Sequence, residues 1–140
     1  MVAIAVLPAI VADNSVVFAW TYAKQGNTYT ERIQVQARHS RVLVPTIWPT
    51  EFANTTNMLV NRKLVTPDYA LKIIEVVATL GLTVDGTPND PRVLFDLCQS
   101  FQLTAYDAAY LELAMRLNIP LATRDQNLVK AAKRVKLFLS

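Results

Sequence analysis

The sequence predicts an α/β domain with a mostly parallel central sheet, on three observations. Short apolar runs rich in β-branched residues alternate with longer runs of helical periodicity. The run at residues 9–12 is apolar throughout, as in a strand that is covered on both faces. The chain has 140 residues and shows no repeat or low-complexity tract, so we expect one domain over residues 1–140.

The first half of the chain is expected to contain two strands and four helices. Pro49 opens one helix, because proline is favoured in a first turn, where its missing N–H costs nothing. Gly81 ends another in the position that glycine prefers. In order, we predict a strand at Ala9–Ala12, helices at Val16–Trp20 and Thr28–Arg38, a strand at Arg41–Pro45, and helices at Thr50–Lys63 and from Thr66 up to Gly81.

The second half continues the alternation. Asp90 and Pro91 start a helix that runs to Phe101, and an alanine-rich stretch after Thr104 forms the next. Helical spacing places five residues of that second helix on one inward face: Tyr106, Ala109, Tyr110, Leu113 and Leu117. The other predicted elements are strands at Leu82–Val84 and Pro120–Thr123, a helix at Gln126–Arg134 and a final strand at Val135–Leu139.

Composition and single residues narrow the possible functions. Residues 2–12 are almost all apolar, but the run is too short for a membrane span of roughly 20 residues, so we interpret it as a buried strand with a short apolar lead-in. Cys98 is the only cysteine, which excludes an internal disulfide and favours the cytoplasm. His39 is the only histidine, so we expect no zinc site of the usual ligands. The net charge of +3 is compatible with a polyanionic partner.

Four of the eleven acidic residues stand where α/β proteins bind ligands. Asp13 directly follows the first predicted strand, and Asp125 follows the strand that ends at Thr123. Glu51 and Asp107 lie in the first turns of their helices. The carboxyl ends of parallel strands share one edge of a sheet, along which ligand crevices open. The four carboxylates can therefore meet at that edge.

Each acid also has an ordinary structural explanation. Asp13 and Asp125 suit helix N-caps, and Thr104 with Asp107 resembles a capping box. Glu51 in a first turn interacts favourably with the helix dipole. A cap stabilises a helix by about 1 kcal/mol, which is reason enough for a carboxylate to be present. Taken singly, each acid favours the structural explanation.

Taken together, the four acids support a metal site as strongly as they support caps. Their neighbours are apolar, which places the carboxylates against a packed interior. Crowded carboxylates raise one another's pKa values, and a hard divalent cation such as Mg²⁺ or Mn²⁺ keeps them ionised. A cluster of oxygen ligands without histidine is typical of metal-assisted phosphodiester hydrolysis.

Four blocks of the sequence, at residues 11–16, 49–54, 103–110 and 121–125, each contain one of the four acids among mostly apolar neighbours. These blocks resemble the PIN-domain family, and more closely the VapC toxins of bacterial and archaeal toxin–antitoxin pairs. The similarity runs from about Ala9 to Lys133. Gln102 departs from it, because such proteins often have a glycine there, and residues 135–140 lack the glycine-containing ending that is common in the family. The blocks are Val11-Ala12-Asp13-Asn14-Ser15-Val16, Pro49-Thr50-Glu51-Phe52-Ala53-Asn54, Leu103-Thr104-Ala105-Tyr106-Asp107-Ala108-Ala109-Tyr110 and Leu121-Ala122-Thr123-Arg124-Asp125.

The resemblance implies a three-layer α/β/α sandwich that acts as an endoribonuclease dependent on Mg²⁺ or Mn²⁺. It also implies a homodimer that is inhibited by a small antitoxin protein. Ser15 and Thr123 correspond to hydroxyls that support the site, whereas Asn14 occupies a variable position without an assigned role. The acidic residues that would hold the metal and serve catalysis are Asp13, Glu51, Asp107 and Asp125.

Basic and aromatic residues offer candidate contacts to RNA. Arg124, between two predicted site residues, is the best candidate for an RNA phosphate contact. The other cations near the C-terminus form either the lip of an RNA groove or a solvated helix face, and both interpretations stay open. They are Lys130, Lys133, Arg134 and Lys136. Packing is favoured over base stacking for Trp20, Tyr22 and Trp48.

The sequence therefore predicts a VapC-type endoribonuclease with RNA as its substrate. Two alternatives remain. One is a PIN-type nuclease for RNA processing that has no antitoxin. The other is a weakly active or inactive PIN domain that serves to bind a partner protein.

Overall fold

A computed structural model describes residues 7–140 of the chain, so most of the expected apolar lead-in lies outside the described residues. The strands are β1 (Ala9–Ala12), β2 (Arg41–Val44), β3 (Thr83–Val84) and β4 (Leu121–Ala122). The first helices are α1 (Asn14–Thr21), the 3₁₀ turn η1 (Ala23–Gln25), α2 (Thr28–Ala37), α3 (Trp48–Asn61) and α4 (Pro67–Ala78). They are followed by α5 (Pro91–Phe101), α6 (Ala105–Leu117) and α7 (Gln126–Arg134).

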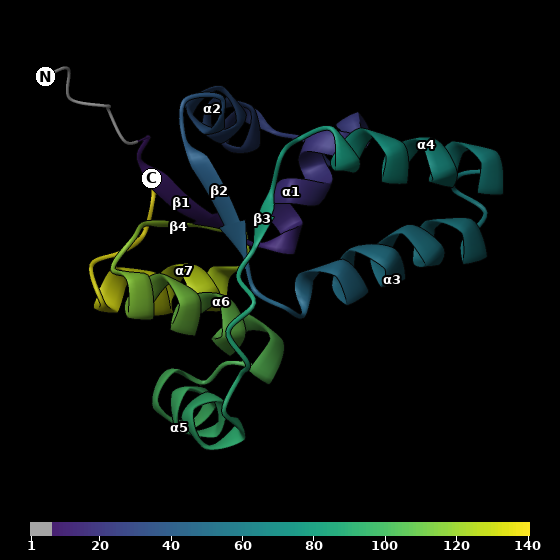
Figure 1. Ribbon diagram of the computed structural model, residues 1–140. Coiled ribbons are helices and arrows are strands. Elements are labelled where there is room, and N and C mark those ends of the chain that lie inside the picture. Colours follow the sequence, from purple (N-terminus) through teal and green to yellow (C-terminus); the bar gives the residue numbers. More distant parts are fainter. Residues whose placement is uncertain (1–6) are drawn as a thin grey trace, which may run out of the picture.

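The four strands form one parallel sheet in the order β3-β2-β1-β4. The chain winds outward from β1 to β2 and β3, then crosses to β4 on the other side of β1. Because such crossovers are right-handed, the two winding directions place their helices on opposite faces of the sheet. Helices α6 and α7 lie on one side, with α5 beyond α6, and α1 and α2 lie on the other (Figure 1). The expected three-layer α/β/α sandwich is confirmed.

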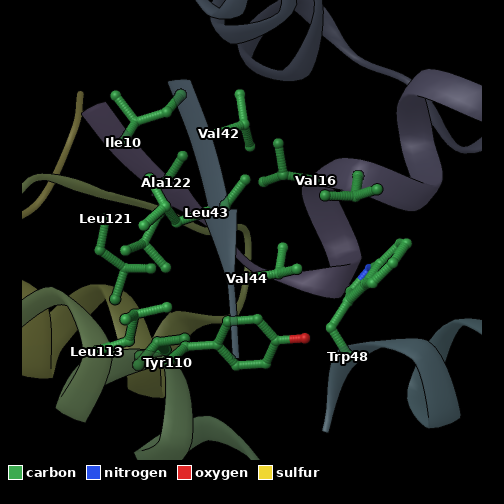
Figure 2. Close-up of a cluster of buried hydrophobic side chains, with 14 of the residues drawn as sticks. Ile10, Val16, Val42, Leu43, Val44, Trp48, Tyr110, Leu113, Leu121 and Ala122 are labelled. Atoms are coloured by element: carbon green, nitrogen blue, oxygen red, sulfur yellow. The ribbon is translucent and has the colours of Figure 1, made fainter. Parts of the chain in front are cut away.

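The core forms where the central strands meet helices from both layers. Ile10 of β1, Leu43 of β2 and Leu121 of β4 are almost fully buried, as their apolar sequences predict. Figure 2 shows side chains of α1 and α6 packed around these strands, with the Tyr110 ring among them. The hydroxyl of Tyr110 points from this core toward the start of α3 at Trp48 (Figure 2). A polar group thus reaches from the apolar core toward the carboxyl edge of the sheet.

Most predicted elements are confirmed with shifted ends, but the inward face predicted for α6 is partly wrong. Tyr106 and Leu117 were expected to face inward, but 58% and 40% of their surfaces are exposed. The buried residues of α6 lie between them, at positions 108–111, 113 and 114. Helix α4 ends at Ala78, and Gly81 follows at φ 68°, the left-handed conformation that glycine adopts after a helix C-terminus, so the prediction that Gly81 ends this helix is confirmed.

The predicted final strand is reduced to one bridge. Lys136 adopts φ 61°, which turns the chain sharply after α7. Only Phe138 then bridges to Leu121, in parallel, with hydrogen bonds from Leu121 N to the Leu137 oxygen and from Leu139 N to the Leu121 oxygen. The segment is therefore attached to the sheet edge without extending it.

Gln102 ends α5 in the left-handed conformation, at φ 53°. This conformation is the one that glycine adopts without strain at a helix C-terminus. The turn that glycine often makes in the resembling proteins is therefore kept here by a residue with a side chain.

Candidate metal centre

The strand order creates a crevice between the carboxyl ends of β1 and β4. From these neighbouring strands the chain departs to opposite faces of the sheet, and at such a switch point α/β proteins bind ligands. Asp13 directly follows β1, and its backbone N–H donates to the Ala122 oxygen of β4 at 3.0 Å. Asp125 lies three residues after the end of β4. The sheet therefore brings together two acids that are 112 positions apart (125 − 13).

Asp13 is buried and accepts three hydrogen bonds. The hydroxyls of Ser15 and Thr123 each donate to its carboxylate at 2.5 Å, and Val16 N donates at 3.2 Å as part of an N-cap on α1. Burial raises the pKa of Asp13 to about 6, against the lowering effect of these three donors. The charge of Asp107 raises it further. The predicted supporting hydroxyls thus contact the first acid directly.

Asp125 caps the last helix and is tied to the same threonine. Its side chain accepts from Leu128 N at 2.9 Å, and its own backbone N–H donates to Thr123 Oγ1 at 3.0 Å. Thr123 therefore donates to Asp13 and accepts from Asp125. One buried hydroxyl fixes the relative positions of both strand-end acids.

Glu51 and Asp107 approach from helices on the two sides of the sheet. Glu51 lies in the first turn of α3, and its carboxylate accepts a 2.7 Å hydrogen bond from Tyr110 Oη. Burial raises the pKa of Glu51, and the charge of Asp107 adds to this effect. Asp107 lies in the first turn of α6, which Thr104 caps; burial and the charge of Asp125 raise the pKa of Asp107. The charges of the four acids therefore act on one another.

All four acids line one cleft of about 300 Å³. None of them is paired with a cation: among residues 7–140, both salt bridges belong to Arg116, with Asp85 and Glu112. Asn14 also lines this cleft, and its amide oxygen is buried and without a hydrogen-bond partner in the described chain. The lining residues are Asp13, Asn14, Ser15, Phe18, Gln25, Glu51, Thr55, Asp107, Tyr110 and Asp125.

The donor set of this cleft fits a hard divalent cation. Carboxylate and amide oxygens are the ligands that Mg²⁺ and Mn²⁺ prefer, and burial raises the pKa values of Asp13, Glu51 and Asp107, an effect that a bound cation would oppose. As the side chains stand, no three acidic, histidine or cysteine residues in the described part of the chain group closely enough to hold one ion. The carboxylates would have to approach one another further to share a cation.

The capping explanation is confirmed for Asp13 and Asp125, and it is compatible with a place in the cleft. Asp13 and Asp125 are N-caps, and Asp107 follows a capped helix start, as the structural explanation requires. The same side chains line the cleft, because a helix that starts at the carboxyl edge of the sheet directs its first turn into the crevice. Capping therefore does not argue against a functional role.

Five lining residues were missed as parts of the site: Asn14, Phe18, Gln25, Thr55 and Tyr110. Tyr110 was assigned only to the core, yet it also donates to Glu51; its position one turn after Asp107, on the same helix face, was the available indication. Asn14 received no role, but its Nδ2 donates to Thr55 Oγ1 at 3.0 Å across the cleft wall. Thr55 carries no sequence feature that pointed to the site.

The remaining candidates lie around the cleft or away from it. Arg124 is exposed beside it, and its guanidinium donates to the Gln25 carbonyl. Tyr22 and Trp48 are buried, and Trp20 Nε1 donates to the Thr30 oxygen, so packing is confirmed for all three. Neither Cys98 nor His39 lines the cleft. Within residues 7–140, no helix combines the length and hydrophobicity needed to cross a membrane.

Comparison with known proteins agrees with this architecture. No curated protein matches the chain. A similar solved structure is that of PAE2754 from Pyrobaculum aerophilum, with a TM-score of 0.64 and 18% sequence identity over 89% of this chain and 84% of the other. At this identity the likeness shows the fold alone. The family model of the PIN domain matches residues 10–134, nearly the whole chain. The chain therefore belongs to the PIN domain family.

Proposed function

We propose that this chain is an endoribonuclease that depends on Mg²⁺ or Mn²⁺ and acts as the toxin of a VapBC-type toxin–antitoxin pair. Membership of the PIN domain family suggests a nuclease. The observation that carries the proposal is the cleft itself, in which four carboxylates without cationic partners face one another at the switch point of a parallel sheet. A phosphodiester is the substrate that such a cleft suits, since a divalent cation held by these carboxylates would offset the negative charge of the phosphate.

The residues at the cleft have different roles in this mechanism. Asp13, Glu51, Asp107 and Asp125 are the proposed metal ligands. Ser15 and Thr123 hold the Asp13 carboxylate in place, and Tyr110 holds Glu51. When bound, the cation supplies a water of lowered pKa and screens the charge of the phosphoryl oxygens. No side chain of the cleft is needed as a nucleophile, because water is the attacking group.

The direct test is RNA cleavage by the purified protein with Mg²⁺ or Mn²⁺, with and without a chelator. Asp107→Asn is expected to lower the cleavage rate at least about 100-fold, since it removes a proposed ligand and leaves the Thr104 cap in place. Asp68→Asn is the matched control, because Asp68 occupies the first turn of α4, is exposed and lies outside the cleft. Full activity of Asp107→Asn, or activity that survives the chelator, would contradict the proposal.

Calorimetric titration with Mn²⁺ separates this function from that of a protein-binding module. A nuclease site of this kind is expected to bind Mn²⁺, and Asp13→Asn is expected to weaken the binding. No binding at millimolar Mn²⁺ would favour the protein-binding module. The distance between the carboxylates in this structure agrees with that alternative.

The proposed partners are RNA, an antitoxin and a second copy of the chain. An apolar hollow of about 470 Å³ lies between η1 and the α3–α4 turn, and α4 exposes Tyr69, Leu71 and Val76. Such surfaces support binding of a protein. Light scattering during gel filtration would measure dimerisation. A neighbouring small reading frame that encodes a DNA-binding protein would distinguish the toxin from a nuclease for RNA processing.

A further inference from the structure

A second hollow, of about 350 Å³, lies beside the acidic cleft. We call it the α2–α7 groove, because its walls come from the start of α2, the end of β4, helix α7 and the segment after it. Its lining residues are Asn27, Tyr29, Thr123, Arg124, Val129 and Phe138. No acidic residue lines it, in contrast to the cleft next to it.

The groove and the acidic cleft share a wall at Thr123 and Arg124. Thr123 lines the groove, while its hydroxyl donates to Asp13 in the cleft. The backbone N–H of Arg124 donates to Ser15 Oγ at 3.3 Å, and its guanidinium donates to the Gln25 carbonyl. Ser15 and Gln25 both line the cleft. A polymer lying in the cleft can therefore continue directly into the groove.

Aromatic rings and cations alternate along the groove. The rings of Tyr29 and Phe138 are stacked, with centroids 6.2 Å apart and planes inclined by 14°. The guanidinium carbon of Arg32 lies 5.5 Å from the centroid of the Tyr29 ring, and Lys133 Nζ lies 5.4 Å from that of Phe138. In the described chain, neither these two cations nor Arg124 forms a salt bridge. Their charges are available to an anion.

Two polar side chains of the groove keep unused donors. Arg124 uses one N–H of its guanidinium for the Gln25 carbonyl, and four others remain. Asn27 uses its Oδ1 to accept from Thr30 N at the start of α2, which leaves its amide N–H₂ group free to donate. Guanidinium groups bind phosphate, and amide groups bind base edges.

We propose that the α2–α7 groove binds an unpaired nucleotide of single-stranded RNA next to the phosphodiester that is cut. This inference rests on the proposed nuclease function and adds a binding subsite to it. The base contacts the Phe138 and Tyr29 rings, and Arg124 and Lys133 hold the adjoining phosphates. Stacking tolerates any base, so the groove positions the strand without selecting its sequence.

The test is the binding of a fluorescent, mixed-sequence single-stranded RNA in a chelator, measured by anisotropy. Phe138→Leu is expected to weaken binding about 5- to 20-fold, since a lost base–aromatic contact has an effect of this order. Phe95→Leu on α5 is the matched control, because 62% of Phe95 is exposed and it lies outside the groove. The melting temperature of each variant shows whether it is folded.

A second pair of variants tests the phosphate contacts while both aromatic rings of the groove are kept. Lys133→Gln is expected to reduce the slope of log affinity against log salt by about 0.7, the value for one contact to a single strand. Lys72→Gln removes the same charge from α4, which lies at the opposite end of the molecule from α7 (Figure 1), and is expected to leave the slope unchanged.

The results separate the groove from the function on which it rests. Weaker binding in Phe138→Leu and a smaller slope in Lys133→Gln, with both controls unchanged, support the groove. If the wild-type protein cleaves RNA and all four variants bind RNA as tightly as the wild type, the proposed role of the groove is wrong and the nuclease function stands. If the wild type binds no single-stranded RNA, the proposed role of the groove is also wrong, and the cleavage assay tests the nuclease function separately.

Discussion

Tyr110 Oη donates a 2.7 Å hydrogen bond to Glu51 Oε1 and so joins α6 to α3 across the acidic cleft. The Tyr110 ring is 1% exposed and packed in the core, so the donor has little freedom to move. Burial and the neighbouring Glu51 charge raise the pKa of Tyr110, which keeps it protonated as a donor. The carboxylate of Glu51 is therefore oriented by a rigid group on another helix.

Tyr110→Phe is expected to raise the pKa of Glu51, because it removes the hydrogen bond that stabilises the ionised form. It should also lower the free energy of unfolding by about 1.5–3 kcal/mol, the usual effect of losing a hydrogen bond to a charged group. Tyr106→Phe is the control, since Tyr106 is exposed on the same helix. Carbon NMR titration of the Glu51 carboxyl and urea unfolding measure the two effects. An unchanged Glu51 pKa would show that the bond does not orient this acid.

Without divalent cations, the protein is expected to lose stability as the pH rises from about 4 to about 6. Asp13 has an ordinary pKa of 3.8 and a folded pKa of about 6, so in this interval the unfolded chain ionises before the folded one. The raised pKa values of Glu51 and Asp107 act in the same direction. The loss from Asp13 amounts to about 3 kcal/mol and is complete above about pH 6.

Urea unfolding at several pH values in a chelator measures this dependence. Hydrogen bonds to Arg116 and Thr87 lower the pKa of Asp85, so Asp85 makes stability rise with pH at lower pH values. The wild type is therefore compared with Asp13→Asn, in which the loss of stability between about pH 4 and about pH 6 should be smaller. Mg²⁺ or Mn²⁺ at pH 7 should restore stability in the wild type and less in Asp13→Asn. Equal curves for both proteins would show that Asp13 does not titrate as stated.

Thr123→Val is expected to destabilise the protein by about 1–3 kcal/mol, because it leaves a buried carboxylate short of one donor. It also removes the acceptor for Asp125 N. Thr123→Ser keeps the hydroxyl and should restore most of the RNA cleavage and Mn²⁺ affinity that Thr123→Val loses. Failure of the serine variant to restore either would mean that packing, rather than the hydroxyl, is what matters there.

Gln102→Gly is expected to stabilise the protein by about 0.5–1 kcal/mol, because it relieves a left-handed residue that carries a side chain. The reverse change, Gly81→Ala at φ 68°, should destabilise it by a similar amount. Thermal unfolding measures both. Neither residue lines the acidic cleft, so RNA cleavage should not change.

Local sequence patterns were sufficient for the class of fold and for the positions of the four acids. Apolar β-branched runs and helical periodicity are local properties, and they predicted all four strands and seven α-helices of the described chain. They failed where burial depends on a neighbour. Tyr106 and Tyr110 have the same apolar character and the same helix, but only Tyr110 meets the sheet.

The order of residues was enough to predict that four carboxylates stand at strand ends and helix starts. The hydrogen bond from Tyr110 to Glu51 and the one from Thr123 to Asp13 join residues 59 and 110 positions apart, and they follow only from the folded chain. These contacts depend on β4 pairing with β1 rather than with β3, the strand before it in the chain. The pairing is decided by crossover handedness and by the packing of two helical layers, which no local pattern encodes.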